Sequence, residues 1–126
     1  PWSETAYFET ARGKEPWAAN WIGWEKEFPQ LRGDFTVEKP IKAARAYACG
    51  VGLYVLFVNG EKVGNEYLTP NFNAYDSWLQ YQTYDITPLL RSGKNAVGAW
   101  LGNGYYKGRV NWPSAIATRF TATAWR

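Results

Sequence analysis

Two segments of the chain interleave aromatic rings with amide and charged side chains outside any regular alternation. In residues 65–78 the candidate groups are Asn71, Phe72, Asn73, Tyr75, Asp76 and Trp78. In residues 102–112 they are Asn103, Tyr105, Tyr106, Arg109 and Trp112. A pyranose ring stacks its C–H face on an aromatic side chain, while its hydroxyls need planar polar partners. The two segments are therefore candidate carbohydrate-binding loops.

The sequence offers little for catalysis. It contains no His, which removes the commonest general base and the usual activating partner of a Ser or Cys nucleophile. Inverting glycosidases need two carboxyl groups about 6.5–9.5 Å apart, and the pairs on offer are Asp76 with Asp85 and Glu25 with Glu27. Asp85 lies where a carboxylate favours the start of a helical turn, and the two Glu lie in a charged stretch. We expect no catalytic residues in this chain.

Composition and charge favour one all-β domain over residues 1–126. The 14 Lys and Arg against 11 Asp and Glu give a net charge of +3, and this length suits a single domain. Aromatic residues make up 18% and Met is absent, which favours strands over helices. The basic residues are scattered, so we expect no nucleic-acid partner. No apolar stretch approaches the roughly 20 residues of a membrane span, so we expect no membrane partner.

The polar and apolar pattern predicts short strands from about residue 31 onward. They cover residues 31–37, 42–49, 53–58, 80–86, 95–101 and 115–125. Residues 53–58 are apolar on both faces, which is typical of a central strand. The single Cys, Cys49, lies in an apolar run and is predicted to be buried rather than nucleophilic. Residues 1–30 are irregular and rich in Trp, and are expected to wrap the sandwich as a lead-in.

Two local motifs predict how strands are connected. Asn59-Gly60 supplies the two positive-φ residues of a type I′ turn, so residues 53–58 should pair with a short strand at residues 61–63. Thr87 is predicted to cap a helical turn, with Pro88 at its first position and Gly93 at its C-terminal stop. Short strands and one short helical turn together predict an all-β, antiparallel β-sandwich. We favour a jelly-roll, galactose-binding-like topology, and periodicity alone leaves an immunoglobulin-like sandwich as the alternative.

Longer motifs carry a family resemblance. The runs VNGEKVG at residues 58–64, YQTYDIT at residues 81–87 and LGNGYY at residues 101–106 follow one another in order. With the flanking residues, from about Trp2 to Arg109, they closely resemble the N-terminal β-sandwich domain of bacterial α-L-rhamnosidases. The hairpin and helical-turn pattern alone also looks like the sugar-binding domains at the front of β-galactosidase-type hydrolases.

The resemblance implies a parent glycoside hydrolase that removes terminal α-L-rhamnose by an inverting mechanism, with its acid and base on a separate (α/α)6 barrel. This chain would be a non-catalytic accessory domain that supports or orients the barrel, with the catalytic and neighbouring domains as partners. The alternative is a carbohydrate-binding module for L-rhamnose or a related sugar in rhamnose-containing glycans.

The resemblance also bears on metals and on behaviour in isolation. Some family members bind L-rhamnose through Ca²⁺, for which Asp76, Asn73 and Asn103 are the candidate oxygen ligands here. A domain that normally docks on a barrel exposes an apolar patch when excised. We therefore predict that the chain alone tends to self-associate.

Overall fold

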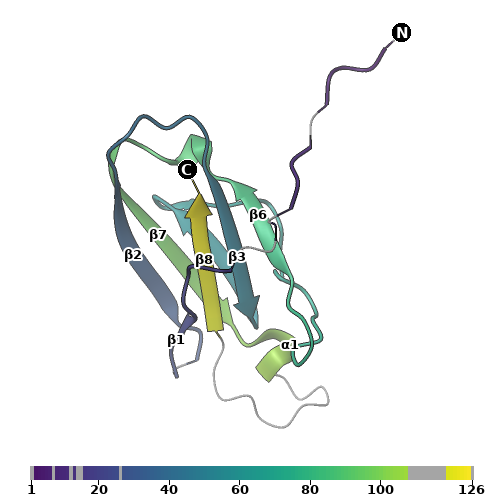
Figure 1. Cartoon of the computed structure of the whole chain (residues 1–126). Helices are drawn as coiled ribbons and strands as arrows, with labels where there is room; N and C mark the ends of the chain where they lie inside the picture. Colours follow the sequence, from purple (N-terminus) through teal and green to yellow (C-terminus); the bar gives the residue numbers. More distant parts are fainter. Residues whose placement is uncertain are drawn as a thin grey trace.

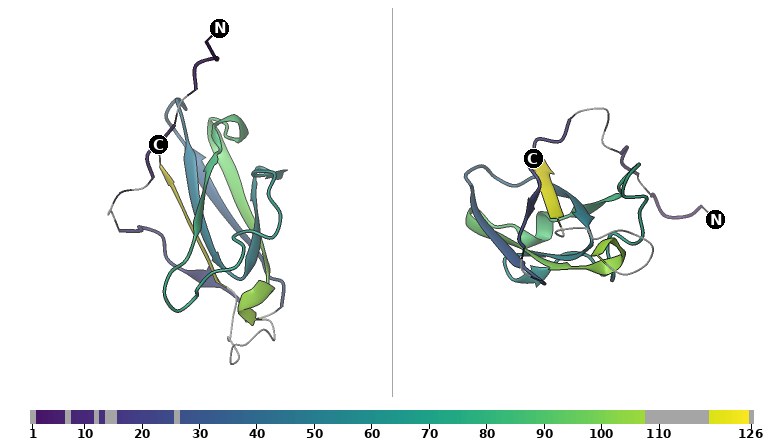
Figure 2. Two further views of the ribbon diagram at one scale, coloured as in Figure 1. Left: turned by 90° about the vertical axis from the view of Figure 1, so that its right-hand side faces the viewer. Right: turned by 90° about the horizontal axis from the view of Figure 1, so that it is seen from below.

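The computed structural model describes residues 2–6, 8–11, 13, 16–25, 27–107 and 119–125, and in residues 119–125 it describes only the side chain of Phe120. Two four-stranded antiparallel sheets face each other (Figures 1 and 2). The first sheet has the order β1 (Ile22–Gly23), β8 (Arg119–Trp125), β3 (Arg45–Val51), β6 (Tyr81–Asp85). The second has the order β2 (Gln30–Val37), β7 (Gly93–Gly102), β4 (Leu53–Val58), β5 (Glu61–Lys62). These orders are those of a jelly roll, which confirms the predicted fold.

The core lies between the two sheets and follows the period-two pattern. In β4, Tyr54, Leu56 and Val58 are buried and alternate with partly exposed residues. Across the core, Ala46 and Ala48 of β3 are also buried. These small side chains leave room for larger ones, and the rings of Tyr54 and Phe120 pack with their centroids 5.0 Å apart. Burying apolar surface in this way provides most of the stability of such a sandwich.

A buried hydroxyl network crosses the same core. The hydroxyl of Tyr54 donates to the side-chain carbonyl of Gln82 at 2.7 Å and lies 3.3 Å from the hydroxyl of Tyr84. Burial, together with the Tyr84 hydrogen bond, raises the pKa of Tyr54. The two phenols therefore stay neutral and hold β4 against β6.

The predicted hairpin at Asn59-Gly60 is confirmed. Both residues have positive φ, 52° and 89°, and Val58 pairs with Glu61 across the turn. Asn59 also reaches β7, because its side-chain carbonyl accepts a hydrogen bond from the amide of Ala96 at 2.9 Å. The turn is thus fixed both by its backbone conformation and by a cross-strand contact.

The predicted helical turn forms as a 3-10 helix, η1 (Thr87–Leu89), but Thr87 does not cap it. Its hydroxyl accepts a hydrogen bond from the amide of Ala44 at 2.9 Å, because the residue preceding β3 lies beside it. The side-chain hydrogen bond at the start of this turn comes from Asp85 instead, because its carboxylate accepts a hydrogen bond from the amide of Thr87 at 2.9 Å. Gly93 is not the stop of this turn: the C-cap is Leu90, and Gly93 begins β7.

One further helical turn, α1 (Gly104–Lys107), follows β7 and was not predicted. Gly104 has a φ of 53°, and a Cβ there would lie 2.7 Å from Cγ of Leu53. A left-handed backbone conformation in such a close contact favours glycine. In the described part of the chain, no helix is long and apolar enough to cross a membrane.

Residues 2–6 extend away from the sandwich, whereas residues 16–21 cross the outer face of the first sheet on the way to β1 (Figure 1). Trp17 packs edge-on against Tyr81 of β6 with ring centroids 5.6 Å apart. Nearer the N-terminus, Glu9 forms an ion pair with Arg45 of β3, which also contacts Asp85 at 2.9 Å. The left view of Figure 2 shows part of this segment on the β8 side of the sandwich, and at its end residues 22–23 enter the sheet as β1.

Candidate functional site

The loop before β6 carries the first candidate segment and is anchored to the sandwich at its start. The amide of Tyr54 in β4 donates to the carbonyl of Thr69 at 2.8 Å, which forms an isolated β-bridge. Two residues later, Asn71 has a φ of 78° and its amide donates to the carbonyl of Leu68 at 2.8 Å. Asn tolerates this left-handed conformation better than most residues. The chain therefore turns sharply as it enters the candidate segment.

Asn73 holds the middle of this loop together. Its side chain is buried, with 1% exposed. The side-chain carbonyl accepts a hydrogen bond from the amide of Gln80 at 2.8 Å, and the side-chain amide lies 3.4 Å from the carbonyl of Asn71. Buried amides are normally satisfied in this way. Asn73 thus fixes the shape of the loop that presents its neighbours.

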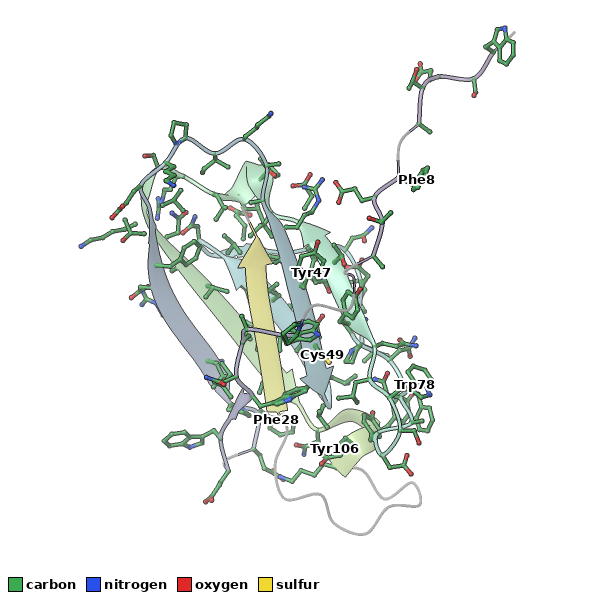
Figure 3. All side chains as sticks on the ribbon, viewed as in Figure 1. Phe8, Phe28, Tyr47, Cys49, Trp78 and Tyr106 are labelled. Atoms are coloured by element: carbon green, nitrogen blue, oxygen red, sulfur yellow. The ribbon has the colours of Figure 1, made fainter. Side chains whose placement is uncertain are left out.

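Rings from the two candidate segments meet at one end of the sandwich. Phe72 packs edge-on against Tyr105 of α1, with centroids 5.7 Å apart, and against Tyr75 at 6.1 Å. Tyr75 in turn packs against Tyr106 at 5.0 Å. We call these four residues, Phe72, Tyr75, Tyr105 and Tyr106, the aromatic cluster. The two segments, about 30 residues apart in sequence, therefore form one continuous feature (Figure 3).

The hydroxyl of Tyr75 is unusual within the cluster. It is buried, and no hydrogen-bond partner for it lies among the described residues. Burial, with a smaller contribution from Tyr105, raises the pKa of Tyr75. An unsatisfied buried hydroxyl costs stability, so such groups are rare in folded proteins. The backbone of Asn73 offsets part of the rise in the pKa of Tyr75, but among the described residues no hydrogen bond to this hydroxyl forms.

Several predicted groups around the cluster face solvent. Phe72 is 61% exposed, Tyr105 is 43% exposed and Trp78 of the same loop is 54% exposed. Asn71 and Asp76 are also exposed. Exposed rings beside amide and carboxylate groups can stack on a sugar ring and bind its hydroxyls. The predicted residues Arg109 and Trp112 lie outside the described residues.

The three candidate calcium ligands do not make up a coordination shell by themselves. Asn73 already uses its side-chain carbonyl within the loop, whereas Asp76 is exposed and Asn103 is partly exposed. Calcium takes about six to eight oxygen ligands. In the described part of the chain, no three His, Cys, Asp or Glu side chains gather to hold a metal. The described residues supply part of a coordination shell at most, so the calcium site stays a prediction.

Cys49 is buried, as the sequence predicts. Its side chain is 5% exposed, and the thiol donates to the carbonyl of Gln80 at 3.3 Å. Burial raises the pKa of this thiol to about 11. A thiol with so high a pKa is almost entirely protonated near neutral pH and is a poor nucleophile.

Sequence reasoning found both loops but not what holds them. Thr69, which anchors the first segment to β4, carries no local signal for that role, and neither does Leu53 of β4, which lies beside Gly104 of the second. Gly104 had a signal, since Gly102-Asn103-Gly104 ends the strand pattern.

Comparison with known proteins decides the family. The family model for the α-L-rhamnosidase N-terminal domain matches residues 39–124. The chain belongs to this family.

Its relatives are larger α-L-rhamnosidases. An α-L-rhamnosidase of Formosa agariphila is 44% identical over 82 residues, which cover 65% of this chain and 9% of that protein. One from Alteromonas sp. is 32% identical over 124 residues, covering 86% of this chain and 14% of that protein. The crystal structure of the Streptomyces avermitilis enzyme complexed with L-rhamnose superposes with a TM-score of 0.71 at 36% identity, covering 75% of this chain and 10% of that one.

These shares have a plain consequence. The α-L-rhamnosidase N-terminal domain described here spans less than about a sixth of the length of the relatives that it matches. The aromatic cluster lies within the matched residues 39–124.

Proposed function

We propose that this chain is a non-catalytic accessory domain of an α-L-rhamnosidase-like glycoside hydrolase, in which it supports or orients the catalytic barrel. The observation that carries the proposal is the family match over residues 39–124, combined with the small share of each relative that the chain covers. In this proposal the catalytic groups, the barrel and the other neighbouring domains lie elsewhere in the same polypeptide.

The arrangement of the acidic side chains supports the non-catalytic role. Asp76 lies in the loop before β6, whereas Asp85 is the last residue of β6. Strand β6, about 13 Å long, lies between the loop that carries Asp76 and Asp85 at its far end. Asp85 is also engaged with Arg45 and Thr87. The other candidates, Glu25 and Glu27, are exposed in the segment after β1.

The accessory role is tested by deletion and by isolation. The chain alone should not hydrolyse p-nitrophenyl α-L-rhamnoside, whereas the complete enzyme should. Removal of this domain from the complete enzyme should lower its melting temperature or its activity. Hydrolysis by the isolated chain, or a deletion that changes neither property, would contradict the proposal.

A second candidate function, recognition of L-rhamnose or a related sugar, is favoured by the aromatic cluster. Its rings join the two predicted loops, Phe72 is 61% exposed, and Asn71 and Asp76 are exposed close to it in sequence. The unused Tyr75 hydroxyl adds a hydrogen-bonding group at the same place. This is the combination of stacking surface and polar groups that carbohydrate sites use.

Calorimetry with L-rhamnose separates the two candidates. If the cluster binds sugar, Phe72→Ala should weaken binding by about tenfold or more, which corresponds to about 1.4 kcal/mol. Phe28→Ala is the matched control, because that ring is equally exposed, at 64%, and lies before β2. Titrations with Ca²⁺ and with EDTA test the calcium prediction. The absence of heat at millimolar sugar would leave the accessory role alone.

Self-association of the isolated chain belongs to the same proposal. The described surface carries several exposed large apolar side chains, among them Trp24, Phe28 and Trp100. Such groups favour association when a covering partner is missing. Light scattering over a range of concentrations should therefore reveal dimers or larger species, and a strictly monomeric chain would count against docking.

A further inference from the structure

The outer face of the second sheet is apolar along one strand. The outward residues of β4 are Leu53, Val55 and Phe57, and all three are partly exposed while their neighbours in sequence are buried. On the adjacent strand β7, Trp100 is 53% exposed and pairs in register with Val55. The rings of Phe57 and Trp100 pack with centroids 4.8 Å apart. We call these four residues the bare face.

Glycine flattens the centre of this surface. Gly98 of β7 pairs in register with Phe57. A Cβ at Gly98 would lie 3.8 Å from Cβ of Phe57 and 3.6 Å from the carbonyl oxygen of Leu31, both ordinary contacts. The sheet could therefore hold a side chain at this position, and glycine leaves the place beside Phe57 without one.

The first sheet provides an internal contrast. Its outer face is covered by the chain itself, through the contact of Trp17 with Tyr81 and the ion pair of Glu9 with Arg45. Within the described residues, no comparable segment crosses the bare face (Figure 2). A sheet that exposes a continuous apolar strip on its outer side usually meets a partner there.

The chemistry of the strip favours a protein surface over a sugar. Its centre consists of aliphatic and aromatic side chains from β4 and β7, whereas the aromatic cluster interleaves rings with amides and carboxylates. Polar groups lie at the margin on β2, where Arg32 and Asp34 form an exposed ion pair at 3.0 Å. An apolar centre with a polar rim is the usual anatomy of a protein–protein interface.

We propose that the bare face is the surface on which a neighbouring domain of the same α-L-rhamnosidase polypeptide docks. The inference rests on the accessory role proposed above and names the surface that performs it. The length of chain outside the structure argues for this occupant, because the matched segments cover only 9% to 14% of the curated relatives considered above. Most of such a polypeptide is therefore available to cover the strip.

Accessibility to a thiol reagent tests contact directly. In Val55→Cys, the new thiol lies on the bare face, while Cys49 is 5% exposed and contributes little background. The new thiol should react with a maleimide in the isolated chain, at a concentration where that chain is monomeric, and react at least about tenfold more slowly in the complete enzyme. Ser92→Cys, at an exposed position in the loop before β7, should react equally in both.

A second variant tests the energetic consequence without removing any contact. In Gly98→Glu, the added Cβ makes only ordinary contacts, and the carboxylate lies opposite Arg32 of β2, which pairs in register with Gly98. The isolated chain should keep its melting temperature or gain slightly, because a strand interior disfavours glycine. The complete enzyme should lose about 4 °C or more in the transition of this domain. Ser92→Glu adds the same charge elsewhere and should change neither protein.

Three outcomes would overturn the inference. One is equal reactivity of Val55→Cys in the isolated chain and in the complete enzyme. Another is that the thiol of Val55→Cys is protected in the complete enzyme only until the enzyme is diluted to a monomer. That result would mean that a second enzyme molecule covers the face. The third is protection of the isolated chain by L-rhamnose, which assigns the face to a glycan.

The deletion experiment keeps this inference separate from the accessory role. If deletion harms the enzyme while Val55→Cys stays reactive, the docking surface is wrong and the role stands. If deletion is neutral while Val55→Cys is protected, the domain docks there without supporting the barrel.

Discussion

The two ends of the sandwich use asparagine in different ways. Strand β7 begins at the upper end of the sandwich in Figure 1. Near its start, Asn95 is 3% exposed, and its side chain makes hydrogen bonds to Asn59, to the amide and carbonyl of Arg91 and to the carbonyl of Gly93. At the lower end, Asn73 is equally buried but makes two, and the nearby Tyr75 hydroxyl makes none among the described residues.

The upper end therefore has a structural role, whereas the lower end keeps polar groups available for a ligand. At the upper end, both the carbonyl and the amide of the Asn95 side chain are hydrogen-bonded. They join the turn after β4 to the residues around the start of β7. The lower end orders its loop with fewer hydrogen bonds and leaves rings exposed around an unused hydroxyl. A network that satisfies itself specifies the fold, while unused polar groups beside exposed rings suit recognition.

Asn95→Ala should give the largest effect. The change removes four hydrogen bonds around a buried side chain, while Asn59 keeps its bond to the carbonyl of Leu89. The free energy of unfolding should therefore fall by about 3 kcal/mol. Urea unfolding of the isolated chain measures it. Asn65→Ala, at an exposed position, should change the free energy by less than about 0.5 kcal/mol. Similar values for both variants would remove the distinction between the two ends.

Asn73→Ala should cost less, about 1.5 kcal/mol, because it removes two hydrogen bonds rather than four. The loss should be local, since the side chain orders only its own loop. Hydrogen exchange should speed up at the amide of Gln80, which Asn73 accepts from, and remain slow in β4. Faster exchange throughout the sandwich would mean that the lower end also specifies the global fold.

Tyr75→Phe should have the opposite sign. Removal of an unsatisfied buried hydroxyl should leave the free energy of unfolding unchanged or raise it by up to about 1 kcal/mol. If the cluster binds sugar, the same variant should bind it more weakly, so that stability and affinity move in opposite directions. A clear loss of stability would indicate that this hydroxyl is already satisfied. Tyr54→Phe is the control that should destabilise, because its hydroxyl is hydrogen-bonded.

Acid should have the smallest effect and should act near the upper end. The hydrogen bonds from Thr87 lower the pKa of Asp85, and the hydrogen bond from Arg45 lowers the pKa of Glu9. The resulting stabilisation is complete above the ordinary values of 3.8 and 4.5, and it is lost as the pH falls through the depressed values. Urea midpoints should therefore drop below about pH 4. Glu9→Gln should show a smaller drop, and an equal drop would exclude Glu9 as a source.

Much of the fold could be predicted because it is encoded locally. The Asn59-Gly60 turn depends on two adjacent residues, and the alternation in β7 predicts which of its side chains face the core. Thr87 was interpreted as a helix cap, but its hydroxyl bonds Ala44, a residue 43 positions away. Such long-range competition for a hydroxyl is invisible to local patterns.

The sequence predicts which residues make up the candidate site, but not how the two loops contact each other. Interleaved rings and amides singled out both loops, yet the contact of Phe72 with Tyr105 depends on how β4 and β7 place the two segments. Burial of Asn73 had no sequence signal, because an asparagine in a loop is usually exposed. Likewise, alternation places Trp100 on the outer side of β7 but does not reveal whether another segment covers it.

The N-terminal segment gives the molecule a built-in reporter. Trp17 and Trp21 line a cavity of about 260 Å³ together with Cys49 of β3. The thiol, with its pKa raised to about 11, should be almost inert to alkylation while these rings stay in place. It is the single cysteine in the chain. The rate of its alkylation should therefore measure how often the segment detaches from the sheet.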